Sequence, residues 1–180
     1  MNNEELLLSQ LKSPSTREKA FRELITLYKE RLYWHIRKIV ISHDDTDDVL
    51  QNTFIKVFRS IDKFKGDSKL FSWMYRIATN EAITFINKSA KRLQTNNEEV
   101  QNQAVNNLTS DVYFDGNEIQ LKLQKAIATL PQKQQLVFNM KYFEDVKYKD
   151  MSHILETSEG ALKASYHLAV KKIEAYLTSD

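Results

Sequence analysis

Apolar residues recur at intervals of three and four along most of the chain, a spacing typical of helices that bury one face. In the first half, this pattern predicts helices over residues 4–12, about 16–40, about 44–61 and about 69–87. Ser15 or Thr16 is the predicted cap of the second helix, and Asp67 or Ser68 that of the fourth. In the second half, the pattern predicts helices over about 119–130, 131–143, 148–155 and 159–177.

The pattern is lost between residues 93 and 117, where Asn and Gln predominate and Lys and Arg are absent. A segment so poor in apolar residues cannot bury enough surface to offset the entropy lost on ordering. We therefore predict an all-α protein with two small helical domains, 1–92 and 118–180, joined by a flexible acidic linker, 93–117.

The composition excludes several classes of protein. The chain has no Cys, which excludes disulfides and thiolate metal sites. It shows neither a secretion signal at its N-terminus nor an apolar run long enough to span a membrane, so we expect a cytoplasmic protein with no membrane insertion. Its four His are scattered, and it has no glycine-rich phosphate loop or nucleophile motif. We therefore expect no catalytic activity, no metal and no cofactor.

The net charge of +2 is unevenly distributed. Residues 1–92 carry 17 Lys and Arg against 12 Asp and Glu, and residues 119–180 carry 9 Lys against 7 acidic residues. Residues 93–118 carry five acidic residues and no Lys or Arg. Two basic blocks around an acidic segment indicate contact with nucleic acid at two places.

Two segments carry chemistry suited to such contacts. In the stretch 64–80, Lys69, either Ser72 or Trp73, Arg76 and Asn80 follow one another at helical spacing. Cations for phosphates, a ring for stacking and an amide for a base edge suit an unstacked strand. The alternative is a core helix with a few solvated polar residues, and Trp73 in particular fits either a core or a DNA-facing position. At the end of the chain, a short helix, a turn and a longer helix have the proportions of a helix-turn-helix.

Several ordered motifs resemble the extracytoplasmic-function (ECF) sigma factors, which are promoter-specificity subunits of bacterial RNA polymerase. Residues 44–58 (DDTDDVLQNTFIKVF) resemble the polymerase-binding helix of sigma region 2. Residues 64–80 (FKGDSKLFSWMYRIATN) are similar to the loop and helix that capture the −10 element. Residues 130–138 and 158–169 resemble region 4. The resemblance implies an alternative sigma factor that binds core polymerase, recognises the −10 and −35 elements and captures the opened non-template strand.

The resemblance also assigns roles to individual residues. Those implied to bind polymerase are Asp47, Asp48 and Gln51. Those implied to bind the −10 element are Phe64, Lys65, Ser68, Lys69, Arg76, Asn80, Lys88, Lys91 and Arg92. Those implied to bind the −35 element are Lys163, Ser165, His167, Lys171 and Lys172. The implied partners are core RNA polymerase, through its β′ clamp helices and β flap, and promoter DNA, with an anti-sigma factor as a further candidate.

The chain departs from the family pattern at three positions. Asn52 stands where an acidic residue is usual, and neither Ser165 nor Leu168 is the common Arg. Because Arg reads guanine through two hydrogen bonds, the usual −35 sequence is not expected here. The alternative hypothesis is a transcriptional regulator that binds duplex DNA through the helix-turn-helix without polymerase. That hypothesis leaves the polar face at 47–51 and the stretch 64–80 unexplained.

Overall fold

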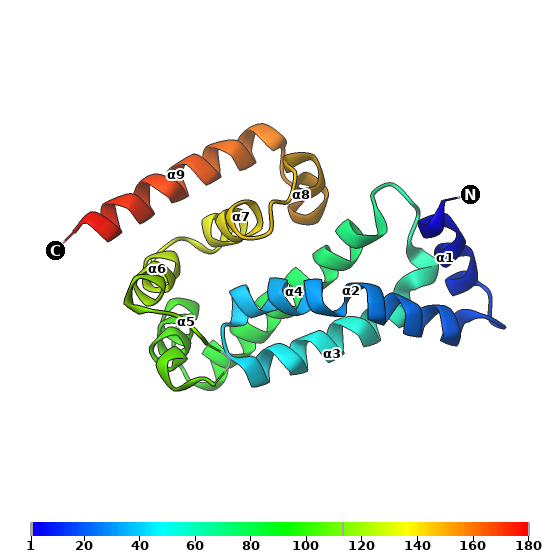
Figure 1. Cartoon of the computed structure of the whole chain (residues 1–180), viewed down its shortest axis with the longest axis horizontal. Helices are drawn as coiled ribbons and strands as arrows, with labels where there is room; N and C mark the ends of the chain where they lie inside the picture. Colours follow the sequence, from blue (N-terminus) through cyan, green and yellow to red (C-terminus); the bar gives the residue numbers. More distant parts are fainter. Residues whose placement is uncertain (1, 113, 180) are drawn as a thin grey trace.

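The computed structural model describes residues 2–112 and 114–179, and within them the regular structure is entirely helical (Figure 1). The helices in the first half of the chain are α1 (Asn3–Lys12), α2 (Arg17–Val40), α3 (His43–Ser60) and α4 (Leu70–Arg92). Those in the second half are α5 (Asn97–Asn106), α6 (Glu118–Ala128), α7 (Gln132–Tyr142), α8 (Tyr148–Leu155) and α9 (Glu159–Thr178). Two 3-10 turns, η1 (Ile61–Lys63) and η2 (Leu108–Ser110), complete the set.

Helices α2, α3 and α4 pack against one another, and α1 packs against α2. In the second half, α9 packs against α6, α7 and α8. The two halves are in contact because α8 packs on α4 and α7 on α2. One apolar core therefore continues from Leu24 and Met74 in the first half to Met140 and Met151 in the second.

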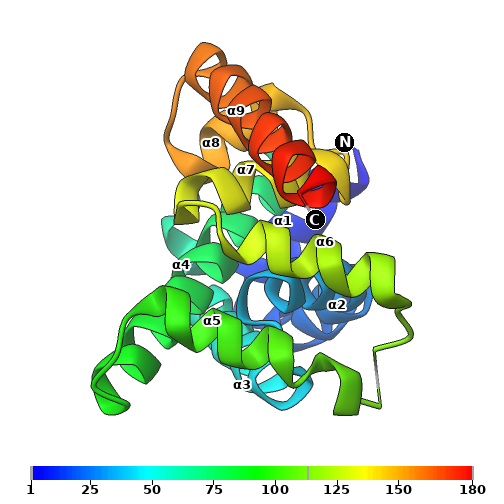
Figure 2. The same ribbon diagram turned by 90° about the vertical axis from the view of Figure 1, so that its left-hand side faces the viewer.

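The structure differs from the sequence prediction between residues 93 and 117. This segment contains α5 and η2, and α5 packs against α4 and α6, as Figure 2 shows for α5 and α6. Two of its few apolar residues, Val105 and Leu108, are buried against Ile41 and Ala128. A polar sequence can thus form an ordered helix when other elements supply its apolar partners.

Two predicted helix caps are wrong. Thr16 precedes α2 but makes no capping hydrogen bond, and its hydroxyl instead donates to the Gln10 carbonyl at 2.8 Å. Neither Asp67 nor Ser68 caps α4; the residue at the cap position is Lys69. The N–H of Leu70 instead donates to Oε1 of Glu4, 66 residues away in sequence, at 3.1 Å.

Candidate nucleic-acid and protein interface

The predicted polymerase-binding residues lie together on one exposed face. Asp47, Asp48 and Gln51 are exposed on α3. With Ile25 and Lys29 of α2, they line a shallow groove of about 380 Å³. Ser42 caps α3, and its acidic first turn lies at the positive end of the helix dipole. The groove presents carboxylates beside apolar surface, which suits a protein partner that carries cations.

The loop between η1 and α4 forms one wall of a cavity of about 310 Å³. The residues lining this cavity are Lys63, Phe64, Lys65, Asp67, Ser68, Trp73, Arg76 and His153. Gly66 turns the loop with φ of 80°, a conformation that favours glycine. The structure thus brings together four of the residues implied to bind the −10 element: Phe64, Lys65, Ser68 and Arg76.

Phe64 and Trp73 are less exposed than rings that stack on an unpaired base are expected to be. Phe64 is buried, with 4% of its surface accessible, and contributes a wall rather than a projecting ring. Trp73 is half-buried, with its ring centroid 5.3 Å from that of Phe64. Trp73 therefore belongs both to the core and to the cavity lining, so the two alternatives for this residue are not exclusive.

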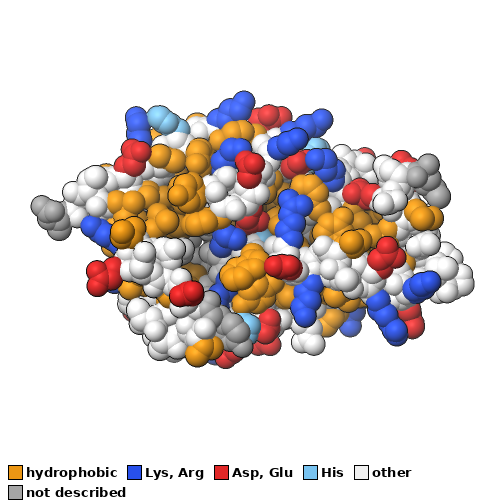
Figure 3. Space-filling model, in the orientation of Figure 1, with side chains coloured by type: hydrophobic (Ala, Val, Ile, Leu, Met, Phe, Trp, Pro, Cys, Tyr) orange, Lys and Arg blue, Asp and Glu red, His pale blue; other side chains and the backbone are white. Residues whose placement is uncertain are grey.

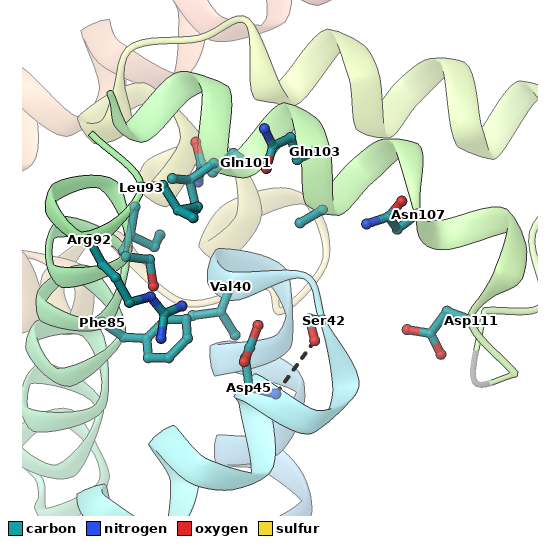
Figure 4. A pocket seen from close by; sticks show the side chains of 14 residues that line it. Val40, Ser42, Asp45, Phe85, Arg92, Leu93, Gln101, Gln103, Asn107 and Asp111 are labelled. Atoms are coloured by element: carbon teal, nitrogen blue, oxygen red, sulfur yellow. Dashed lines mark hydrogen bonds between the residues drawn. The ribbon is translucent and has the colours of Figure 1, made fainter. Parts of the chain in front are cut away.

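The remaining residues implied to bind the −10 element lie outside this cavity. Lys69 lines a neighbouring cavity of about 540 Å³, and Asn80 is exposed farther along α4. Lys88, Lys91 and Arg92 are exposed near the end of α4, about 18 to 24 Å along the helix from Arg76. Figure 4 shows Arg92 beside Phe85 in a separate cavity of about 270 Å³, which α5 helps to line.

Helix α8 lies against the part of α4 and its preceding loop that carries Lys69 and Arg76. Asp150 accepts from Lys69 Nζ at 3.1 Å, and Glu156 accepts from Arg76 Nη1 at 3.2 Å. His153 of α8 lines the same cavity as Phe64 and Arg76. Two cations implied to bind DNA are therefore paired with carboxylates from the other half of the chain. The sequence pattern did not single out Asp150, His153 or Glu156, because contacts across about 80 residues leave no local signal.

A second set of contacts between the halves is buried. His35 of α2 is 2% exposed, and its Nδ1 lies 3.1 Å from Oε1 of Glu144 in the turn after α7. Its Nε2 lies 2.7 Å from the hydroxyl of Thr79, which itself donates to the Tyr75 carbonyl. Both ring nitrogens of His35 thus have hydrogen-bonding partners, and one of these partners comes from the other half of the chain.

The charges around Glu144 keep its carboxylate ionised. Burial raises the pKa of this group, but the neighbouring His35 and Lys38 lower it by more than burial raises it. The net pKa therefore lies below the usual value. Burial also lowers the pKa of Lys38, against the opposing effect of Glu144. The junction between the halves therefore contains a cluster of mutually dependent charges.

Helix α9 presents the residues implied to bind the −35 element. Lys163, His167, Lys171 and Lys172 are exposed, whereas Ser165 is half-buried. Leu162, Ala169 and Ile173 are buried on the opposite face, as the periodicity predicts. Figure 3 shows Lys, Arg and His side chains along the upper edge of the molecule, where α8 and α9 lie. This face is open to a polyanion while α8, through His153, lines one side of the cavity beside Phe64.

Two other kinds of site find no support in the described part of the chain. Among residues 2–112 and 114–179, no group of three or more His, Cys, Asp or Glu is placed to hold a metal ion. Within the same ranges, no helix is both long and apolar enough to cross a membrane.

Comparisons with known proteins agree with this geometry. Residues 24–92 match the family model Sigma-70 region 2, and residues 120–173 match Sigma-70, region 4. The ECF RNA polymerase sigma-E factor of Haemophilus influenzae is 28% identical over 165 residues, covering 87% of each chain. The ECF RNA polymerase sigma factor SigW of Bacillus subtilis is 26% identical, covering 82% of this chain and 83% of SigW.

Solved structures show the same fold. CnrH, in complex with the cytosolic domain of CnrY, superposes with a TM-score of 0.72 at 20% identity over 99% of both chains. The sigma factor RpoE of Bartonella quintana, in complex with the anti-sigma factor NepR, gives a TM-score of 0.67 at 19% identity, covering 90% of this chain and 99% of RpoE. With both sigma-70 regions in order and relatives along most of its length, the chain belongs to the ECF sigma factors, alternative subunits that bind RNA polymerase and direct the initiation of transcription.

Proposed function

We propose that the loop 64–69 and the first half of α4 hold the opened non-template strand at the −10 element, while α9 reads the −35 element in duplex DNA. The observation that carries this proposal is the cavity at the loop, which Lys65 and Arg76 line together with Phe64 and Trp73. The half-buried Trp73 ring can stack on an unpaired base while the buried Phe64 forms the wall behind it, and the cations neutralise neighbouring phosphates. The protein acts in the cytoplasm with RNA polymerase and contributes no catalysis of its own.

The strand-binding surface must be uncovered before it can act. In the structure, Asp150 pairs with Lys69 and Glu156 pairs with Arg76, and these are the cations that DNA phosphates would need. The polymerase-binding residues Asp47, Asp48 and Gln51 are exposed in the same state. Core polymerase can therefore bind α3 first, and separation of α8 from α4 then makes Lys69 and Arg76 available to DNA.

The two DNA contacts differ in kind. On α9, Lys163, Ser165 and His167 lie in the first half of the helix, where a helix-turn-helix reaches base edges. Lys171 and Lys172 lie farther along and suit phosphates, as do Lys88, Lys91 and Arg92 at the end of α4. Phosphate contacts supply affinity, and the loop cavity and the start of α9 supply sequence preference.

The test is run-off transcription with purified core polymerase and a library of promoters, with binding to core measured separately. Arg76→Ala should leave core binding unchanged and lower the salt dependence of −10 strand binding by about one unit of slope. Lys19→Ala, at an exposed position on α2, is the matched control. Failure of the wild-type protein to bind core or to stimulate transcription would refute the proposal. Tight, specific binding to duplex without polymerase would instead favour a polymerase-independent regulator.

A further inference from the structure

The loop 64–69 has few restraints of its own. Lys65, Gly66 and Asp67 are exposed, and no heavy atom lies within 4 Å of the position a Cβ would take on Gly66. The Ser68 hydroxyl donates only to the adjacent Lys69 carbonyl, at 3.3 Å. A loop of this kind needs contacts from elsewhere if it is to hold one conformation for a base.

Helix α1 supplies a contact at each end of this loop. At its start, Nζ of Lys12 donates to the Phe64 carbonyl at 3.0 Å. At its end, Oε1 of Glu4 accepts from the Leu70 N–H at 3.1 Å, at the first residue of α4. The residue at the cap position, Lys69, has no acceptor in its side chain, so Glu4 does the work of an N-cap. Its carboxylate also lies at the positive end of the α4 dipole.

Helix α1 is itself held firmly enough to act as a support. Leu7 and Leu11 are buried in the main core, and Asn2 and Glu5 form a capping box at the start of the helix. Beyond its end, Nε of Arg17 donates to the Leu11 carbonyl at 2.8 Å, and Nη2 of Arg17 pairs with Asp62 in η1 at 2.5 Å. These contacts join α1 to the turn that leads directly into the loop.

We propose that α1 is part of the promoter-opening machinery, with Glu4 and Lys12 as positioning residues that clamp the two ends of the strand-capture loop. This inference rests on the proposed function of the loop. The region 2 match begins only at residue 24, so it does not include α1. Neither residue needs to touch DNA: each acts by fixing the backbone that carries Phe64, Lys65 and Lys69.

The test compares Glu4→Ala and Lys12→Met with the controls Glu23→Ala and Lys19→Met, which change exposed residues on α2. Each holoenzyme is titrated with a fluorescent single-stranded −10 oligonucleotide, and core affinity and thermal stability are measured in parallel. Each clamp variant should bind the strand about five-fold more weakly, with core affinity within two-fold of wild type. Glu4→Gln keeps an acceptor oxygen and should recover most of the strand affinity. Amide exchange at Leu70 should accelerate in Glu4→Ala and not in Glu23→Ala.

The outcomes separate two failures. If the wild-type holoenzyme does not bind the strand, the proposed function is refuted, and the proposed role of Glu4 and Lys12, which rests on it, is refuted as well. If the wild type binds but the clamp variants bind equally well, the clamp is refuted. Equal losses of core affinity and strand affinity, accompanied by a lower melting temperature, would also refute it, because α1 would then only stabilise the domain.

Discussion

The contact between His35 and Glu144 offers a direct test of how the two halves of the chain are held together. The perturbation is Glu144→Ala, which leaves Nδ1 of the buried His35 without its acceptor and the partly buried Lys38 without its counter-charge. We call the form seen in the structure closed, and a form in which α7 and α8 have separated from α2 and α4 open. In the open form, water solvates both groups, so the cost falls on the closed form alone. The substitution should therefore shift the protein toward the open form.

The magnitude follows from burial. The side chains of His35 and Glu144 are 2% and 8% exposed, so a lost partner is not replaced by water while the halves stay together. An unsatisfied buried donor costs about 1–3 kcal/mol, and a middle value of about 2 kcal/mol is an approximately 30-fold change in the open-to-closed ratio. Oε2 of Glu144 is buried without a hydrogen-bond partner, and this unpaired atom itself disfavours the closed form. Because Glu144→Ala removes this atom as well, the net cost should stay below about 3 kcal/mol, the upper end of the range for an unsatisfied buried donor.

The assay uses two measurements. Because the chain has no Cys, dyes can be attached to single cysteines introduced at Arg59 on α3 and Glu174 on α9, and energy transfer between them reports opening. The affinity of the isolated protein for the −10 strand reports the same equilibrium, because apparent affinity scales with the open fraction. Glu144→Ala should lower energy transfer and raise strand affinity by up to about 30-fold.

The matched control is Asp145→Asn, one residue away. Asp145 is 93% exposed and pairs with Lys141 within the same half, at 3.2 Å. Its φ of 47° is tolerated by Asn, so this change introduces no backbone strain. Changes under about three-fold for Glu144→Ala in both measurements, or equal changes in the control, would show that the buried pair does not hold the halves together.

Three further predictions concern other contacts. Asp150→Asn combined with Glu156→Gln should raise the strand affinity of the isolated protein a few-fold, since each partly exposed pair contributes at most about 1 kcal/mol; unchanged binding would mean that α8 does not compete with DNA. The pKa of Glu144 is lowered in the closed form, where its ionisable neighbours are His35, Lys38 and Tyr75, so its carboxylate stabilises that form at any pH above the ordinary pKa of 4.5. This stabilisation is lost as the pH falls through the lowered pKa. Energy transfer should therefore fall on acidification in wild type and fall less in Glu144→Gln. Gln135→Ala removes buried hydrogen bonds to the Leu130 carbonyl and to Gln101, and thermal denaturation should show a loss of about 1–3 kcal/mol, whereas the exposed Gln132→Ala should change stability little.

Much of the local structure followed from the sequence. The 3.6-residue periodicity located eight of the helices, including the short α8 over Tyr148–Leu155, because each buries one apolar stripe. The missed helix was α5, since its order depends on Ile41 and Ala128, which lie far from it in sequence.

The candidate site was predictable only in part. The loop residues Phe64, Lys65 and Ser68 do line one cavity with Arg76, because they are close in sequence and joined by one turn and one helix. The burial of Phe64 in the main core and the capping of α4 by Glu4 were not predictable, because both depend on packing between elements that lie apart in the sequence.

The sequence by itself determined the helices, their order and the kinds of residue placed in each motif, since periodicity, capping and charge are local properties. Only the tertiary structure decided which charges are paired: Lys69 with Asp150, Arg76 with Glu156 and His35 with Glu144, across 81, 80 and 109 residues. Those pairs exist because α8 and the turn after α7 pack against α4 and α2, and this packing excludes water from the His35–Glu144 pair, whose side chains are 2% and 8% exposed. The same packing places carboxylates on the surface proposed for the −10 strand and leaves the proposed polymerase-binding residues and α9 exposed.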